Sequence, residues 1–467
     1  RVLFRSVSDS TVRGVAETLW YPFWDAGLKL SPAAHTTKSV LALAGDDLDT
    51  ATSVLDVRCL AGSPDVVAAV QHGAREQWRK RPFVWLERLH ESSSSRWERF
   101  GPVASLLEPD LKDGRGGLRD NDLVRWALRL ERDDVAAALE GPADDLVAPA
   151  EFLLAVRCEL HRATGRPANT LLLQDQDRVA EAMGFADADA LMRNIAGAAH
   201  AIEWASERFW TRVSRLIRSG GRPTRSGSAT VIAPGVIDLE GEANPSPDAD
   251  LDEQSYVFRF AAAAAHAGIP MSGRALRLLA SRGSAPGEEW SENTRRAFVS
   301  LLRAGEWLVH TIEALERYGL FSRFFPEWRH VRSLPQRNAL HTYTVDHHLL
   351  QTVANANEFV RDVARPDLLL VGSLLHDIGK GYPGDHTEVG VELATGIMQR
   401  MGFTADDLHI VQKLIEHHLL LPETATRRDL SDPRTAANVA AAVNDLTTLE
   451  LLAALTESDS RATGPAA

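Results

Sequence analysis

The chain has 467 residues, of which 44% are hydrophobic and 25% charged, as in ordinary globular proteins. Its formal net charge of -13 argues against a broad nucleic-acid-binding surface, which needs a basic face, but leaves room for a pocket that binds one nucleotide. The sequence contains no run of about 18 uncharged apolar residues, so we expect neither a membrane span nor a signal peptide.

The length predicts two to four domains. The isolated cysteines, Cys59 and Cys158, have no metal-type spacing and favour a reducing compartment, so we expect a cytoplasmic protein. The chain begins with Arg1 and ends at 464–467 without a helix-ending signal. We therefore expect a fragment of a longer protein.

Hydrophobic periodicity predicts a mainly α-helical fold in which one stretch, 47–60, mixes helical and strand periods. A break rich in glycine and proline at 219–252 contains a strand-like segment at 229–232 and predicts a short hairpin. The segments expected to be helical are 12–30, 65–98, 120–218 (several helices), 254–318 and most of the chain after 334.

A glycine-rich basic string at 108–120 lies between predicted helices. Its glycines would let backbone amides approach an anion, and its cations are Lys112, Arg115 and Arg119. The alternative is a plain turn in which Asp120 caps the next helix.

Eight of the 16 histidines lie between positions 341 and 418, around the sequence Leu-His-Asp-Ile-Gly-Lys at 375–380. Neutral imidazole and carboxylate groups are ligands for Zn, Mn, Fe or Mg ions. Water bound to such an ion supports hydrolysis at neutral pH. This pattern predicts a divalent-metal centre built on helices.

The segment 366–376 is nearly uncharged and should be a buried helix that ends in His376 and Asp377. For one isolated pair, a structural hydrogen bond would explain the burial. Several further ligands favour a metal instead, among them His341 and His348, which are seven residues apart on a probable helix. The others are His386, His417, His418 and Asp459.

This order of histidines and aspartates resembles the HD phosphohydrolase superfamily. The resemblance implies two ion sites that share a bridging carboxylate, Asp377. The implied ligands are His348, His376, Asp377 and Asp459 for the first ion, with His386 and His417 completing the second. His341 competes with His348 for the leading position, and His418 is expected to point to another face.

Asp377, His376 and Lys380 are the expected catalytic residues. Lys380 could meet a phosphate oxygen as a point charge, and Arg427 and Arg428 could add guanidinium groups. A solvated loop is an equally good interpretation of the two arginines.

From about Val12 onward the chain also resembles the bifunctional uridylyltransferase/uridylyl-removing enzymes that modify the PII nitrogen-signalling protein. The most specific matching strings are 341–346 (HTYTVD) and 424–433 (TATRRDLSDP). The resemblance implies a mainly α fold with a truncated α/β nucleotidyltransferase remnant (1–75), an associated helical region (76–218), a connector (219–333) and an all-α HD domain (334–467).

The family's Gly-Gly-x-Gly-Arg…Ser-Asp-x-Asp string is not found in this sequence. The Asp-x-Asp pairs at 47–49, 187–189 and 248–250 lack its glycine-rich lead. Asp56, in a strand-like context, would be the third carboxylate of the transferase site. We therefore expect the transferase half to be inactive, and we expect no glutamine-sensing ACT domain after Asp459.

The implied activity is metal-dependent removal of UMP or AMP from a tyrosine of PII. The implied cofactor is a divalent ion, Mg or Mn, with Fe or Zn as alternatives. The implied partners are PII and a nucleotide (UTP/UMP or ATP/AMP), without a membrane. The alternatives are a tRNA-type nucleotidyltransferase with an HD appendage, which the negative charge disfavours, and a non-catalytic module that binds nucleotide or PII.

Overall fold

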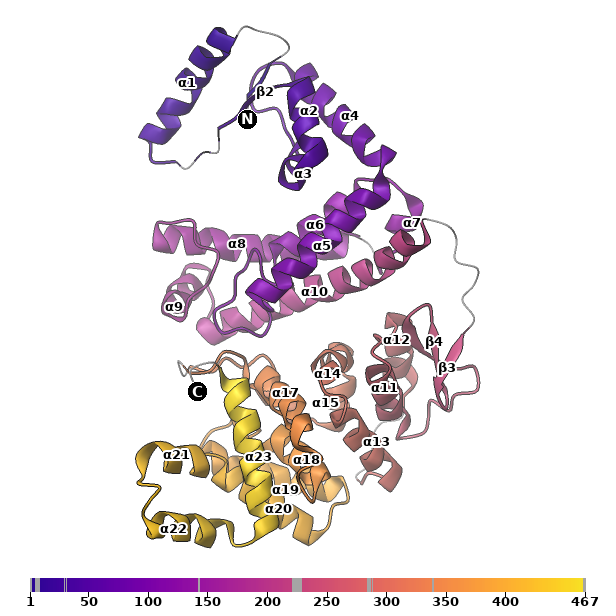
Figure 1. Cartoon of the computed structure of the whole chain (residues 1–467), viewed down its shortest axis with the longest axis vertical. Coiled ribbons are helices and arrows are strands. Elements are labelled where there is room, and N and C mark those ends of the chain that lie inside the picture. The colour runs from indigo at the N-terminus through magenta and orange to yellow at the C-terminus, as the bar shows by residue number, and fades with distance from the viewer. Residues whose placement is uncertain are drawn as a thin grey trace. The chain divides into compact units, whose positions relative to one another are not determined.

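The structure is a computed structural model, and it describes residues 2–4, 9–28, 30, 32–141, 143–220, 229–283, 287, 289–337 and 340–464, with side chains from residue 14 onward. Helices dominate these residues, and the predicted mainly α fold is confirmed (Figure 1). The chain forms two compact units, each assembled from discontinuous segments. Unit 1 contains residues 1–103, 110–158 and 197–224, and unit 2 contains 104–109, 159–196 and 225–467.

Unit 1 combines a two-stranded parallel sheet with helices. Strand β1 (Val2–Phe4) pairs with β2 (Ala34–Thr36) in the register Leu3 to His35. The helices are α1 (Asp9–Asp25), α2 (Thr37–Asp46), α3 (Leu48–Leu55), α4 (Pro64–Lys80), α5 (Pro82–Phe100), α6 (Leu118–Leu128), α7 (Asp133–Ala136), the 3-10 helix η1 (Ala143–Leu146), and parts of α8 (Val147–Thr164) and α10 (Ala188–Ser219).

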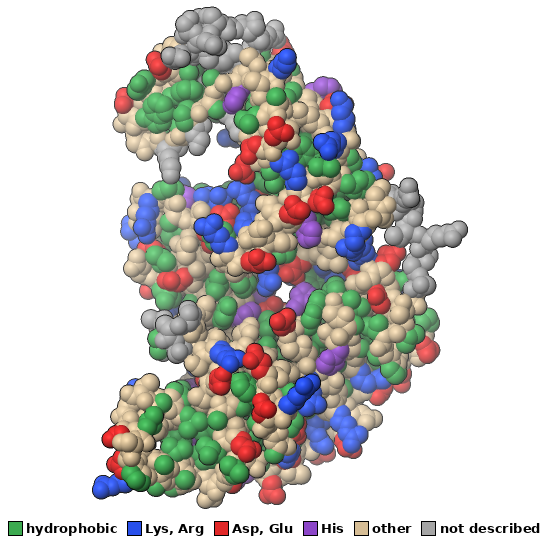
Figure 2. Space-filling view, viewed as in Figure 1, with side chains coloured by type: hydrophobic (Ala, Val, Ile, Leu, Met, Phe, Trp, Pro, Cys, Tyr) green, Lys and Arg blue, Asp and Glu red, His purple; other side chains and the backbone are tan. Residues whose placement is uncertain are grey.

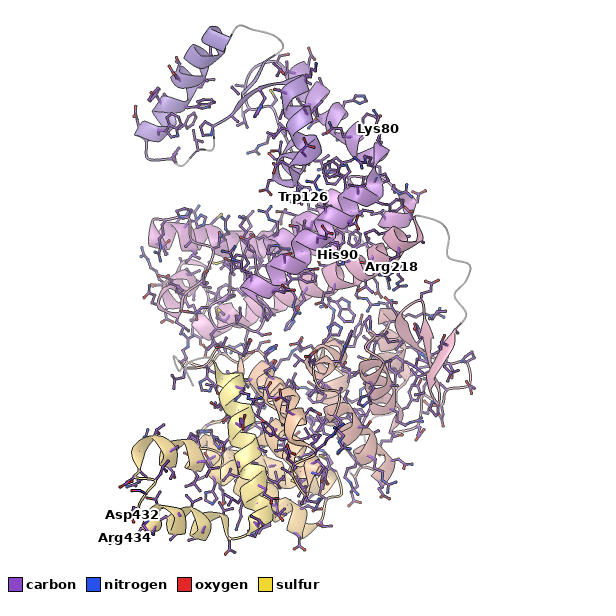
Figure 3. All side chains as sticks on the ribbon, viewed as in Figure 1. Lys80, His90, Trp126, Arg218, Asp432 and Arg434 are labelled. Atoms are coloured by element: carbon purple, nitrogen blue, oxygen red, sulfur yellow. The ribbon has the colours of Figure 1, made fainter. Side chains whose placement is uncertain are left out.

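The ambiguous stretch 47–60 is helical in its first half, where the side chain of Asp47 caps α3 by accepting a hydrogen bond from the Thr50 amide. The segment 65–98 is helical, as expected, and it is divided into the two helices α4 and α5. Pro82 occupies the first turn of α5, where its missing N–H costs nothing, but it cannot continue α4. In Figure 3, His90 lies on α5 and Arg218 near the end of α10, and the His90 ring stacks on Trp210.

Helix α1 carries the apolar residues predicted for an amphipathic helix, but several of them face solvent, including Leu19, Phe23 and Trp24. Figure 2 shows hydrophobic surface over α1, the helix that carries these exposed side chains. Ala16 is the buried apolar residue of this helix among those whose side chains the structure describes.

Residues 110–120 of the glycine-rich loop pack within unit 1. A Cβ on Gly114 would lie 2.7 Å from the Asp110 carbonyl oxygen, and one on Gly116 would lie 2.6 Å from the Ala199 carbonyl oxygen. The Asp120 carboxylate accepts a hydrogen bond from the Gly116 amide at 2.8 Å. These contacts favour the plain turn, because close packing accounts for the glycines without a bound anion.

Unit 2 contains a three-stranded antiparallel sheet in the order β3-β4-β5, followed by helices that form its core. The hairpin expected near 229–232 is thus a three-stranded meander, while 221–228 lies outside the described residues. The elements of unit 2 are β3 (Thr230–Ala233), β4 (Val236–Leu239), β5 (Glu242–Pro245), α9 (Leu173–Ala182), α11 (Tyr256–His266), α12 (Gly273–Arg282), α13 (Glu292–Leu302), α14 (Trp307–Arg317), α15 (Leu320–Phe324), α16 (Trp328–Val331), α17 (Val345–Ala356), η2 (Asn357–Phe359), α18 (Pro366–Leu375), α19 (His386–Arg400), α20 (Ala405–His417), α21 (Leu420–Arg427), α22 (Pro433–Val443) and α23 (Leu446–Thr463), together with the remaining parts of α8 and α10.

Helix α18 is the centre of the C-terminal part of unit 2. Every residue from Leu368 to Leu375 is buried, as its uncharged sequence predicts. It packs against α17, α20 and α23, and Gly372 permits the closest approach because a Cβ there would lie 2.7 Å from Leu414 on α20. The two residues that follow α18, His376 and Asp377, are therefore held in the interior.

Within the described residues, no single helix has both the length and the apolar character needed to cross a membrane. Helices α22 and α23 meet those criteria only when taken together, and they are bent by 102° relative to each other.

Candidate metal centre

Histidine and aspartate side chains from five helices and their ends meet around Asp377. We call this group the HD cluster. Its members are His348 on α17, His376 and Asp377 after α18, His386 at the start of α19, His418 at the end of α20, and Asp459 on α23.

The first half of the cluster is buried. His348 Nε2 lies 3.0 Å from Asp459 Oδ1 and 3.8 Å from Asp377 Oδ2. His376 Nε2 lies 3.6 Å and 3.5 Å from the same two oxygens. The two imidazole Nε2 atoms are 3.3 Å apart. Four atoms that could bind a metal ion, two imidazole nitrogens and two carboxylate oxygens, thus lie close to one another.

The second half uses the other oxygen of the same carboxylate. Asp377 Oδ1 lies 3.8 Å from His386 Nε2 and 3.9 Å from His418 Nε2. The geometry allows two metal-binding triads, His348–His376–Asp377 and Asp377–His386–His418, in each of which the ligand atoms lie within 4.8 Å of one another. Asp377 belongs to both.

The loop after Asp377 fixes the position of His386. A Cβ on Gly379 would lie 2.1 Å from the His386 carbonyl oxygen and 2.5 Å from the Gly390 amide nitrogen. No other residue fits there without moving the first turn of α19. Asp385 caps that turn by accepting hydrogen bonds from the amides of Thr387 and Glu388.

Two of the imidazoles are oriented by backbone carbonyl groups. His376 donates its Nδ1 hydrogen to the Ser373 carbonyl at 2.9 Å, and His418 donates to the Ile415 carbonyl at 2.7 Å. Each ring therefore presents an unprotonated Nε2 to the cluster when it is neutral. This is the arrangement by which proteins orient metal-ligating histidines.

The chemistry of the cluster fits a cation. Asp377 Oδ1 is buried and has no hydrogen-bond donor among the described residues, and an unpaired buried acceptor is costly. With neither a proton nor a metal ion between them, the two Nε2 atoms, 3.3 Å apart, would also repel each other through their lone pairs. A positive ion between these atoms would remove both costs.

The local field also favours positive charge. Burial by itself lowers the pKa of His376, but Asp377 and Asp459 outweigh it and raise that pKa to about 10. Burial raises the pKa of the Asp377 carboxyl, yet His376 and Lys380 hold it well below its usual range. The carboxylates thus remain ionised and available as ligands.

Lys380 lies next to the bridging carboxylate. Its Nζ is 2.6 Å from Asp377 Oδ2 and donates a hydrogen bond to Gln336 Oε1 at 2.7 Å. The lysine predicted to meet a phosphate therefore contacts the carboxylate, at the edge of the cluster.

The structure differs from the sequence prediction at His417. His418, 4% exposed, belongs to the second triad, and His417 is absent from both triads. The reason is helical geometry: adjacent residues point about 100° apart, and the buried face of α20 that contains Val411, Leu414 and Ile415 continues to position 418.

His341 is not on a helix, since α17 begins at Val345. The segment before α17 is held by backbone hydrogen bonds from Thr342 to Thr463 and from Thr344 to Ser105. The His341 ring nevertheless lies 5.5 Å from that of His348, centroid to centroid, although His341 belongs to neither triad.

The predicted phosphate-binding arginines lie outside the HD cluster. Arg427 and Arg428 are exposed at the end of α21, and Arg427 pairs with Glu423 at 3.3 Å. Asp432 and Arg434, labelled in Figure 3, mark the start of α22 on the other side of the same loop.

The predicted cations of unit 1 are held in ion pairs within that unit. Lys112 lies 3.7 Å from Asp113, Arg115 lies 2.6 Å from Glu203, and Arg119 lies 3.8 Å from Asp113. These carboxylates offset the positive charge expected to attract an anion.

Asp56 lies at the C-terminal cap of α3, whereas a strand-like context was expected. Its carboxylate accepts a hydrogen bond from the indole N–H of Trp126 at 2.8 Å and pairs with Arg129 at 3.5 Å. The expected strand does not form because 48–55 satisfies its backbone groups as a capped helix.

A helical module with a buried His–Asp pair and flanking histidines defines an HD-domain protein, and residues 345–457 match the HD domain family model. Residues 85–210 match the model for GlnD PII-uridylyltransferase. Together with the relatives that follow, these matches show that the chain belongs to the family of bifunctional uridylyltransferase/uridylyl-removing enzymes.

Relatives with that name match almost the whole chain. Identity is 42% to the protein of Streptomyces coelicolor over 98% of this chain, 40% to that of Mycobacterium tuberculosis over 97%, and 36% to that of Corynebacterium glutamicum over 96%. The matched regions cover 56%, 57% and 64% of these relatives. The chain thus spans a little over half the length of the first two.

Proposed function

We propose that the HD cluster binds two divalent cations and that the chain hydrolyses the phosphodiester linking a nucleotide, UMP or AMP, to a tyrosine of the PII signalling protein. The observation that carries this proposal is the placement of two triads on opposite oxygens of Asp377. The family supports the substrate, because its members are named as uridylyl-removing enzymes.

In this proposal His348, His376, Asp377 and Asp459 hold the first ion, and Asp377, His386 and His418 hold the second. Bound divalent ions would lower the pKa of a water ligand and offset the charge of the phosphoryl oxygens. The protein's contribution is to fix the ligands: α18 and α23 bring the carboxylates together, and the Ser373 and Ile415 carbonyl groups orient two imidazoles.

We assign different roles to the two halves of the site. The first half is buried, whereas the His386 side chain is 39% exposed. Substrate would therefore approach from the His386 side. Lys380, at the edge of the cluster, would hold the Asp377 carboxylate in place and could reach a phosphoryl oxygen from the same position.

The preferred ions in this proposal are Mg or Mn, with Fe or Zn as alternatives, because mixed imidazole and carboxylate ligands accept several metals. Arg427 and Arg428 would contact the protein substrate, since both are exposed on the segment between His418 and Asp459. We expect the reaction to take place in the cytoplasm, in keeping with two cysteines that are both free.

We further propose that the described part of unit 1 supplies no transferase chemistry. Asp56, the predicted third carboxylate, is engaged by Trp126 and Arg129. The Asp-x-Asp candidates, one in unit 1 and two in unit 2, serve local structure: Asp47 and Asp187 cap helices through the amides of Thr50 and Ala190, and Asp248 accepts a hydrogen bond from Ser246.

The main competing function is a module that binds nucleotide or PII without turnover. It would keep the HD cluster, and it differs from a hydrolase only in the fate of the bound ester. A tRNA-type enzyme is less well supported, because the model that matches residues 85–210 is that of GlnD PII-uridylyltransferase and the net charge is -13.

The direct test uses PII carrying a nucleotidyl-tyrosine as substrate, with Mn²⁺ or Mg²⁺ added. We expect release of free UMP or AMP, measured by chromatography, and the loss of release when EDTA is added. Binding of modified PII without nucleotide release, by protein that contains the metal, would contradict the hydrolase and support the binding module.

A further inference from the structure

Two adjacent cavities lie on unit 2 at the far end of α18 from the HD cluster. One, of about 360 Å³, is lined by residues of α13 and by Asp367 and Phe403. The other, of about 560 Å³, is lined by residues around η2. Arg303 lines both cavities, and we call the two together the arginine recess. Each volume by itself is in the range of small-ligand sites.

The recess is lined by more cations than anions. Its arginines are Arg295, Arg296, Arg303 and Arg361, and its carboxylates are Asp367 and Glu358. This concentration of positive charge is notable in a chain whose net charge is -13.

The carboxylates of the recess already have other partners. Asp367 accepts two hydrogen bonds from Arg365, at 3.0 and 2.8 Å, and Glu358 pairs with Arg461 at 2.7 Å. These carboxylates are therefore paired with arginines outside the recess and do not neutralise Arg303 or Arg361.

Two of the arginines have no protein partner within the part of the chain that the structure describes. Among the described residues, neither Arg303 nor Arg361 makes a side-chain hydrogen bond or ion pair. Arg296 forms only an exposed pair with Glu292. Guanidinium groups are well suited to phosphate because they donate two parallel hydrogen bonds.

The recess also has an apolar wall. The guanidinium group of Arg295 lies over the Phe403 ring, 5.3 Å from its centroid, and is held there by the carbonyls of Met401 and Gly402. Val299 lines the same cavity. A flat aromatic base could pack on this wall while its phosphates meet the unpaired guanidinium groups.

We propose that the arginine recess is a second ligand site, separate from the HD cluster, that binds a nucleoside triphosphate. Arg303 and Arg361 bind the phosphate chain, and the wall formed by Phe403 and Val299 contacts the base. The ligand would lie beside Asp367 in the first turn of α18. The same helix ends at Leu375, directly before His376 and Asp377, so the recess and the HD cluster are joined by one buried helix.

The test measures binding to the full chain by isothermal titration calorimetry with ATP and UTP as probes. EDTA is present throughout, and Asp377→Asn is run in parallel, so that metal-dependent binding at the HD cluster does not contribute. We expect saturable binding of at least one probe by both proteins, weaker binding of inorganic triphosphate, and no binding of adenosine or uridine.

The matched variants are Arg303→Ala, Arg361→Ala and Arg282→Ala. Arg282 is also exposed and unpaired among the described residues but lines neither cavity. We expect the first two to weaken binding about tenfold each, the effect of losing one charged hydrogen bond, and the third to change nothing.

Several outcomes would overturn the proposal. They are no binding of either nucleotide, equal weakening by Arg282→Ala, an unchanged affinity in Arg303→Ala, or equal affinity for inorganic triphosphate and the nucleotides. The first three would exclude the site, and the last would exclude a nucleotide as its ligand. Because all three arginines are exposed, circular dichroism should show folded variants in each case.

Discussion

Two buried carboxylates, Asp120 in unit 1 and Asp377 in unit 2, have opposite surroundings. Asp120 accepts hydrogen bonds from Arg96 at 2.5 Å, from the Trp97 indole at 2.9 and 3.0 Å, and from the Gly116 amide. Asp377 has one strong partner, Lys380, and its second oxygen faces imidazoles at 3.8 and 3.9 Å without a hydrogen-bond donor.

The pKa values of the two carboxyl groups are shifted in opposite directions. Burial raises the pKa of Asp120, and Arg96 offsets this only in part, so the net pKa is raised. At Asp377, His376 and Lys380 outweigh burial and lower the pKa. A buried acid whose acceptors are filled by protein donors stabilises the fold. One that stays ionised with a vacant acceptor next to imidazoles is arranged for a cation.

The largest expected effect comes from Asp377→Ala. Removing the shared carboxylate should abolish nucleotide release, by more than about 10³-fold, because the metal contribution to such hydrolysis is worth several kcal/mol. Release from modified PII and metal content by mass spectrometry are the measurements. The control is His409→Ala, an exposed histidine on α20 outside the cluster. Normal turnover by metal-free Asp377→Ala would show that the cluster is not the reaction centre.

Asp120→Ala should act on stability. It leaves the buried guanidinium of Arg96 without its partner, so we expect a loss of about 3–5 kcal/mol in the free energy of unfolding, as for other broken buried pairs. Urea denaturation followed by circular dichroism measures it. An unchanged urea midpoint would mean that the pair of Asp120 with Arg96 does not stabilise the fold.

The substitutions His418→Ala and His417→Ala distinguish the metal ligand that the structure indicates from the one that the sequence predicted. We expect the first to lower the affinity for the second ion at least about tenfold, since even outer-sphere changes have effects of this size. The second should leave it unchanged. Titration with Mn²⁺ followed by electron paramagnetic resonance gives both affinities. The reverse order would restore His417 as the ligand.

A smaller effect, with a defined pH dependence, is expected at Asp407. Burial raises its pKa, but hydrogen bonds from Arg365 and Thr404 outweigh it, so the folded pKa lies below the unfolded value. Its stabilisation is therefore present above the unfolded pKa and is lost as the pH falls through the folded pKa.

We expect Asp407→Asn to lose about 1 kcal/mol at pH 7, because Arg365 is partly exposed and screened by solvent. The difference from the unsubstituted chain should shrink below about pH 4, the usual carboxyl range. Unfolding curves across pH test this, and a difference that does not depend on pH would exclude the ion pair as its source.

Much of the HD cluster was predictable because its residue types are rare in such density. His376 and Asp377 follow an uncharged segment whose burial the composition already implies. The sequence could not choose between His417 and His418, because that choice depends on which face of α20 packs inward. Nor could it place His341, since the residues before Val345 are held by contacts with distant segments.

In unit 1 the sequence was less informative. Charge at 112–119 predicted an anion site, but the partners that offset it, such as Glu203, come from residues about 90 positions later. Asp56, which was expected in a strand, instead follows helix α3, because Asp47 caps the start of that helix. The sequence also could not show why position 379 requires glycine, because the atoms that a Cβ there would meet belong to α19.

The amino-acid sequence alone determined that this chain is mainly helical, that a buried His–Asp pair ends one apolar helix, and to which family the chain belongs. These properties follow from local periodicity, composition and motifs, each of which depends on residues that are close together in the sequence. Only the tertiary structure decided which imidazoles face Asp377 and, for the residues it describes, which acceptors have no donor and which arginines have no partner. Those properties depend on distances between residues far apart in the chain, and packing alone sets them.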